Sequence, residues 1–171
     1  MHLLLVSILS LTSLLVNAPQ QTAWSAYSSA EGQFSAAMPA EPRTSMIVTE
    51  TANGPLYTRT VSATDKDLNE YMVSWTAYDK NVEYKGSDEV FDRVRDALIW
   101  SKGGKLVSEA RISMIGRPAR AITFTDSDGR IVEARFYFIG TRFYQVMAES
   151  RSKQDYAVSD KFFESFKVQG G

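Results

Sequence analysis

The chain has no cysteine, and its only histidine is His2. The lack of cysteine excludes disulfides, thiolate metal sites, thiol catalysis and a lipid-modified N-terminal cysteine. His2 lies in a segment that we expect to be removed, as argued below. The remaining chain would then hold no histidine base, no histidine metal ligand and no Ser-His-Asp triad. We identify no catalytic, cofactor-binding or metal-binding residue in it.

An excess of charge of either sign is also missing. Nineteen basic residues nearly balance twenty acidic ones, for a net charge of −1 over 171 residues. The sequence therefore has neither the basic footprint of a nucleic-acid-binding protein nor a polybasic membrane patch. No repeat or long linker divides the chain, so we expect a single domain over residues 19–171.

An apolar run near the N-terminus predicts export. Leu3–Val16 is shorter than the roughly 20 residues of a spanning helix and has the length of a signal-peptide core. Val16 and Ala18 place small or apolar residues where a signal peptidase reads them. We predict a signal peptide over residues 1–18, a periplasmic or secreted protein, and no stable membrane span after cleavage. The alternative is that this run forms a buried first helix.

Hydrophobic periodicity predicts an α+β fold with a mostly antiparallel sheet. Period-two patterns and turn residues mark strands at Trp24–Tyr27, Gln33–Met38, Arg43–Glu50, Leu56–Ala63, Tyr71–Tyr78, Lys105–Ile115, Ala119–Thr125, Arg130–Ile139 and Arg142–Glu149. Helical spacing predicts a helix over Ser87–Lys102, which Gly103 and Gly104 end, and a second over about Gln154–Phe166. The second helix should dock Phe162, Phe163 and Phe166 onto the sheet.

Three local patterns resemble functional sites, and we interpret each as structural. Ser150–Lys153 matches the S-x-x-K motif of penicillin-recognising enzymes but lacks its companion motifs. Asp126–Gly129 resembles the start of a calcium loop, but a hairpin turn with Asp-Gly explains it better. The carboxylate pairs Asp65 with Asp67 and Asp88 with Glu89 could serve a hydrolase. They lie in a predicted loop and at a predicted helix start, where acidic residues are common.

Two groups of residues could form an interaction surface. Ile99 and Trp100 fall outside the apolar stripe of the first helix, and tryptophan is enriched at binding hot spots. We favour the alternative that a neighbouring loop or sheet edge covers this helix end.

Arginines also gather around the C-terminal hairpins, at Arg117, Arg120, Arg135 and Arg142. They could receive a carboxylate or phosphate. Cross-strand pairs with acidic neighbours such as Glu133 and Glu149 are the favoured reading. The candidate surface is therefore Trp100, Arg117, Arg120 and Arg142.

Four segments together carry a family resemblance. They are Glu31–Pro39 (EGQFSAAMP), Gly116–Arg120 (GRPAR), Arg142–Val146 (RFYQV) and Phe162–Lys167 (FFESFK). In this order and spacing the chain resembles small exported bacterial proteins of the PsbP-like superfamily, over most of residues 24–168. The resemblance implies an antiparallel sheet flanked by helices on both faces, an α/β/α sandwich. It also implies a non-enzymatic accessory role, and it transfers no site residue.

These observations favour an exported, non-catalytic accessory or protein-binding module whose partner is a protein of the cell envelope. A small-ligand carrier is the first alternative, with a cleft between the sheet and the terminal helix and a surplus of aromatics at Trp24, Trp75, Trp100 and Phe163. A hydrolase that uses carboxylates or serine is the least favoured. The identity of the partner and the oligomeric state stay open at this stage.

Overall fold

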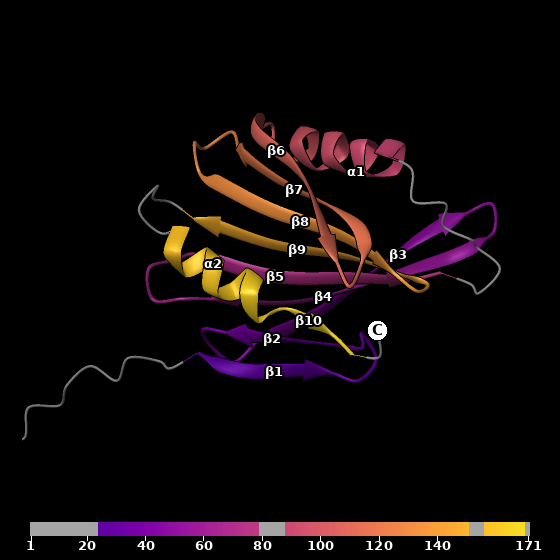
Figure 1. Ribbon diagram of the computed structural model, residues 1–171, viewed down its shortest axis with the longest axis horizontal. Helices are drawn as coiled ribbons and strands as arrows, with labels where there is room; N and C mark the ends of the chain where they lie inside the picture. The colour runs from indigo at the N-terminus through magenta and orange to yellow at the C-terminus, as the bar shows by residue number, and fades with distance from the viewer. Residues whose placement is uncertain (1–23, 79–87, 151–155, 170–171) are drawn as a thin grey trace, which may run out of the picture.

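The computed structural model describes residues 24–78, 88–150 and 156–169, which form a large sheet, a small sheet and two helices (Figure 1). The large sheet has the order β3-β4-β5-β9-β8-β7-β6, and every neighbouring pair is antiparallel. Its strands are β3 (Arg43–Thr51), β4 (Gly54–Thr64), β5 (Glu70–Ala77), β6 (Lys105–Met114), β7 (Arg117–Thr125), β8 (Ile131–Ile139) and β9 (Arg142–Ser150).

The small sheet contains β1 (Ser25–Ser29), β2 (Phe34–Met38) and β10 (Lys167–Val168), in the order β1-β2-β10. Strand β10 follows α2 (Tyr156–Ser165) and returns the C-terminus to the first hairpin. The Gln169 amide extends this contact by donating to the Gln33 carbonyl at 2.7 Å. The sequence did not predict β10, because two residues are too few to show a period of two.

One face of the large sheet, here called the first face, packs against the small sheet and α2. Tyr71, Val73 and Trp75 alternate along β5 and are all buried on this face, as their spacing predicts. Phe34 of β2 lies between the sheets, with its ring centroid 5.3 Å from that of Trp75. Phe162 and Phe163 of α2 and Phe166, which directly follows the helix, are buried in the same cluster, as predicted.

The second face packs against α1 (Asp88–Ser101). Phe91 is the buried anchor of this helix and lies in a cluster with Ile122, Phe124 and Phe136. Figure 1 shows α1 beside β6 and β7, away from the small sheet and α2. Ile99 also packs against this cluster, although it falls outside the apolar stripe predicted for the helix.

The layers differ from the predicted arrangement. A mostly antiparallel sheet with two helices is confirmed. A sandwich with helices on both faces is not confirmed, because the first face is covered by a three-stranded sheet together with the short helix α2. That second sheet exists because Phe34, Ala36 and Met38 bury one face of β2 against the core.

Most predicted turns are confirmed, but one is shorter than expected. Ile115 and Gly116 both adopt positive φ, at 51° and 67°, and connect β6 to β7. A two-residue turn of this kind matches the twist of a hairpin. Strand β7 therefore begins at Arg117, and Pro118 lies within it rather than in the turn. Pro118 pairs with β6, whereas the pairing with β8 begins at Ala119.

Several predictions fall on residues outside the described ranges, namely the signal peptide over 1–18, the helix start at Ser87 and the lysine of Ser150–Lys153. Among the described residues, neither helix has the length and apolar character that crossing a bilayer requires.

Candidate functional site

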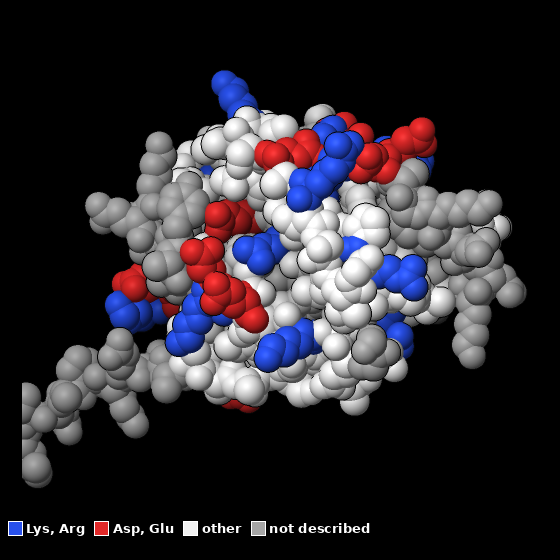
Figure 2. All heavy atoms as spheres, viewed as in Figure 1, with Lys and Arg blue, Asp and Glu red and all other residues white. Residues whose placement is uncertain are grey.

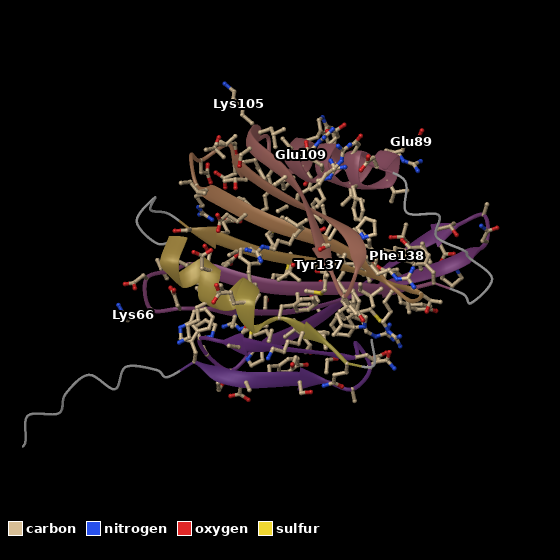
Figure 3. All side chains as sticks on the ribbon, viewed as in Figure 1. Lys66, Glu89, Lys105, Glu109, Tyr137 and Phe138 are labelled. Atoms are coloured by element: carbon tan, nitrogen blue, oxygen red, sulfur yellow. The ribbon has the colours of Figure 1, made fainter. Side chains whose placement is uncertain are left out.

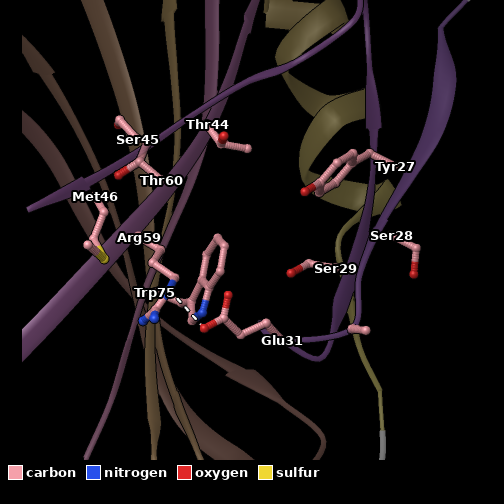
Figure 4. Close-up of a pocket in the computed structure, with 11 residues that line it drawn as sticks. Tyr27, Ser28, Ser29, Glu31, Thr44, Ser45, Met46, Arg59, Thr60 and Trp75 are labelled. Atoms are coloured by element: carbon pink, nitrogen blue, oxygen red, sulfur yellow. Dashed lines mark ion pairs between the residues drawn. The ribbon is translucent and has the colours of Figure 1, made fainter.

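A groove opens where the small sheet ends over the edge of the large sheet. It has a volume of about 540 Å³ and lies between the β1–β2 hairpin and strands β3 and β4 (Figure 4). We call it the hairpin groove. The first wall contains Tyr27, Ser28, Ser29, Ala30 and Glu31, and the rest of the lining comes from Thr44, Ser45, Met46, Arg59, Thr60 and Trp75.

Trp75 closes the floor of the groove. It is 5% exposed, held by its position on the first face of β5 and by the Phe34 ring. Arg59 is its cross-strand partner on β4 and so shares this face. Every second residue of β4 projects from this face. The charged residue Arg59 lies there among the apolar or aromatic residues Tyr57, Val61 and Ala63. That break in the pattern was the sequence signal for the groove, and sequence reasoning missed it.

An ion pair crosses the groove. The Arg59 Nε lies 2.8 Å from a carboxylate oxygen of Glu31, and both side chains are partly open to solvent, at 32% and 61%. Arg59 also lies over the Tyr57 ring, with its guanidinium carbon 5.8 Å from the ring centroid. Because both side chains are partly exposed, each can pair with an opposite charge on a ligand in place of its present partner.

The outer rim of the groove is an open edge of the sheet. All nine residues of β3 are exposed, and the strand pairs only with β4 among the described residues. Met46 and Val48 project from the first face, because their partners Arg59 and Tyr57 lie there, and Ile47 projects from the second. The exposed fractions are 54% for Met46, 46% for Val48 and 65% for Ile47. Met46 and Val48 thus place two exposed apolar side chains next to each other on the first face, a feature of contact sites.

The hairpin groove is lined mostly by polar and aromatic groups. It offers hydroxyls, one carboxylate, one guanidinium and two aromatic rings. The described residues contain no group of three acidic or histidine side chains that could hold a metal ion. The Thr60 hydroxyl is already hydrogen-bonded to Ser74 at 2.8 Å, and Ser29 accepts from the Gly32 amide at 2.9 Å. These contacts fix the orientation of both side chains in the walls.

The predicted interaction residues do not all lie on one face of the sheet, because Arg142 projects from the first face and Arg120 contacts α1 on the second. Trp100 is 86% exposed near the end of α1, so the expectation that a loop or sheet edge covers it was wrong. Arg117 is exposed at the start of β7. Arg142 donates to the Gln33 side-chain oxygen at 2.7 Å and joins β9 to the first hairpin. Whether any of them contacts a partner stays a prediction.

Arg120 has a structural position. Its side chain is 5% exposed and forms ion pairs with Asp88 and Asp92 of α1 and with Glu109 of β6. Figure 3 shows Glu109 among the nitrogen-bearing side chains beside α1. Hydrogen bonds from Arg111 and Arg120 hold the pKa of the Asp88 carboxyl below its usual value. These ion pairs hold α1 against the edge of the sheet, and the Asp88 carboxylate is engaged in them.

A second buried acid is also neutralised by neighbours. Glu149 is 4% exposed and pairs with Lys102 and with Arg130, the latter at 2.6 Å. Burial alone would raise the pKa of Glu149, but hydrogen bonds from the two cations outweigh it and lower the pKa. Arginine pairing with strand acids is thus observed, though Arg130 rather than one of the four named arginines binds Glu149.

In two other candidate motifs, an aspartate side chain accepts hydrogen bonds from backbone amides of its own loop. An oxygen of Asp65 accepts from the amides of Asp67 and Asn69, each at 2.9 Å, which shapes the β4–β5 loop. Asp126 accepts from the Asp128 and Arg130 amides, at 2.9 and 2.8 Å, in the hairpin turn that its sequence predicts.

Surface charge is mixed where it can be seen. On the face in Figure 2, acidic and basic side chains alternate over α1 and again at the left, and neither sign forms a continuous field. This distribution agrees with the balanced charge of the sequence.

Comparison with known proteins identifies the fold. No known family and no curated protein sequence matches the chain. Among solved structures, it is similar to cyanobacterial PsbP (CyanoP) from Synechocystis sp. PCC 6803, with a TM-score of 0.59 and 11% sequence identity. The match covers 86% of this chain and 93% of the other. The chain therefore has a PsbP-like fold, which confirms the resemblance carried by the four short segments.

Proposed function

We propose that this chain is an exported, non-catalytic accessory protein that binds a protein partner in the cell envelope through the hairpin groove. The observation that carries the proposal is the groove itself. It combines an exposed ion pair with the neighbouring apolar side chains of an open sheet edge. Interfaces commonly pair an apolar centre with charged groups that orient the partner.

Three further observations support it. The sequence lacks cysteine and, beyond His2, histidine. The run Leu3–Val16 supports export through a signal peptide over residues 1–18. The solved protein of similar fold is a PsbP, and the family resemblance implies accessory roles and an α/β/α sandwich. We infer that this chain is a variant of that sandwich, with a small sheet added to the layer of α2.

Site-specific photo-crosslinking in the producing cell tests the proposal. A photoreactive amino acid at Ser28, an exposed residue of the groove wall, should form an adduct with a specific envelope protein. The same amino acid at Lys105, exposed at the far edge of the sheet, is the matched control. Arg59→Glu should abolish the Ser28 adduct. No adduct at Ser28, or the same adducts at both positions, would refute the proposal.

A small-ligand carrier is the second candidate, because a volume of about 540 Å³ is within the range of small-molecule pockets. The groove is not where a carrier's cleft was expected. The interface between the sheet and α2 is filled by Phe162, Phe163 and Phe166, each at most 3% exposed. Native mass spectrometry of the purified protein would show a bound small molecule, which Trp75→Ala should release.

A further inference from the structure

The two edges of the large sheet differ in how they are protected. An edge strand exposes unpaired backbone amides and carbonyls. Proteins usually protect such a strand from pairing with other strands by charges, bulges or prolines. Strand β6 has a bulge between Leu106 and Ser108, carries charged residues, and lies under the ion pairs of α1. The centre of strand β3 has none of these devices, since residues Ser45–Thr49 are uncharged and contain no proline or glycine.

We propose that β3 pairs in antiparallel fashion with β3 of a second copy of this chain, which joins two seven-stranded sheets across a two-fold axis. The inference deepens the proposed function, because it names what completes the groove at its open rim. An isologous contact of this kind needs a surface that complements itself.

Strand β3 is complementary to itself in this direction. A two-fold axis perpendicular to the sheet places residues of the two copies that project from the same face opposite each other. A register centred on Ile47 satisfies this condition. Met46 then lies opposite Val48 of the other copy, and Ile47 lies opposite its own copy. Apolar and β-branched cross-strand pairs of this type stabilise sheets.

The charges of β3 favour the same arrangement. The charged residues of the strand are Arg43, at its start, and Glu50, near its end. Antiparallel pairing brings the basic end of one strand beside the acidic end of the other. Parallel pairing would instead place like charges side by side. The charge pattern therefore favours a second copy in the antiparallel direction.

Pairing of this geometry would merge the two grooves. Because the axis is perpendicular to the sheet, the first faces of both copies point to the same side. Met46 of each copy would then lie in a shared floor, with a Glu31–Arg59 pair on either side. The resulting trough would hold one partner with two symmetric contacts. For a partner that engages both, avidity should strengthen binding by about 100-fold.

The absence of native cysteine allows a direct test with single cysteines. With the full-length chain expressed and purified, Ile47→Cys should form an intermolecular disulfide under mild oxidation. Val107→Cys, 64% exposed on the β6 edge, is the control and should form no intermolecular disulfide. Light scattering should show a concentration-dependent dimer for the unmodified protein, and Ile47→Lys should abolish it, whereas Val107→Lys should not. A monomer at every soluble concentration, or equal crosslinking at both positions, overturns the inference.

The result of the dimer test can be distinguished from the result of the crosslinking test of the proposed function. If the Ser28 adduct forms but no dimer does, the groove binds a partner and the inference fails alone. If the dimer forms without any adduct, the inference stands as an assembly and the proposed function fails. Where both hold, Ile47→Lys should weaken partner capture by about 100-fold without abolishing it.

Discussion

The Arg59 side chain lies 2.8 Å from the Glu31 carboxylate, and this pair joins the turn of the small sheet to the second strand of the large one. Because both groups are partly exposed, the pair should add less than about 1 kcal/mol to the free energy of unfolding. We expect Arg59→Glu to leave the stability within that limit and to abolish partner binding. Urea denaturation and the Ser28 crosslink measure the two effects separately.

The double variant Glu31→Arg with Arg59→Glu restores the pair with its charges exchanged. It should keep normal stability and still fail to bind, since a partner recognises each charge at its own position. Normal binding by the double variant would show that the ion pair only links the two sheets and does not recognise the partner.

Arg120 should be important for stability, because its buried guanidinium neutralises three carboxylates at once. Arg120→Ala leaves acids of α1 and β6 facing one another without their cation, and we expect a loss of about 3 kcal/mol. The control is Arg111→Ala. Arg111 is 78% exposed and pairs with Asp88, so its loss should cost under about 1 kcal/mol. Similar losses for the two variants in thermal unfolding would contradict the structural role of Arg120.

Glu133 and Glu149 should change the pH dependence of stability in opposite directions. Burial raises the pKa of Glu133, which accepts a hydrogen bond from Ser159 of α2. A raised folded-state pKa contributes stability at low pH that is lost as the pH rises through it. Glu133→Gln should therefore gain stability relative to the wild type as the pH rises through the raised pKa of Glu133.

The lowered pKa of Glu149 has the opposite sign. Its contribution is present above the ordinary glutamate pKa and is lost as the pH falls through the lowered value. Glu149→Gln should therefore cost most stability near neutral pH and least in acid. Denaturant midpoints measured across the acid range give both curves, and parallel slopes for the two variants would refute the assignment.

Trp100 should contribute nothing to folding despite its size. At 86% exposure its truncation to alanine should change the free energy of unfolding by less than about 0.5 kcal/mol. Phe162, which is fully buried, should cost about 3–5 kcal/mol on the same truncation. If Trp100 contacts a partner, a photoreactive residue in its place forms a second adduct. A large loss of stability for Trp100→Ala would mean that the residue packs in solution.

The local elements were predictable because their causes are local. Alternation along β5 and the phenylalanine spacing of α2 placed the correct side chains in the core, and Gly103 ended α1 with a φ of 57°. Strand β10 and the start of β7 were missed. The first is too short for a pattern, and Pro118 signals a turn unless its partner strand is known.

The functional site was less predictable, because it depends on contacts between distant segments. In the sequence, Trp100 and Arg120 were both candidates for one interaction surface. The structure leaves one almost fully exposed and buries the other among three acids. The groove joins a turn near residue 30 to β3, β4 and β5, and the break at Arg59 was its main local sign.

The sequence by itself determined most of the secondary structure, the balance of charge, and the absence of cysteine and, beyond His2, of histidine. These properties follow from composition and from the spacing of neighbouring residues. Only the tertiary structure decided which strands become edges, which polar groups are buried, and where the small sheet stops short of β3. Strand order depends on pairs such as Trp75 with Tyr144, far apart in the chain, and their contact is set by packing of the whole core.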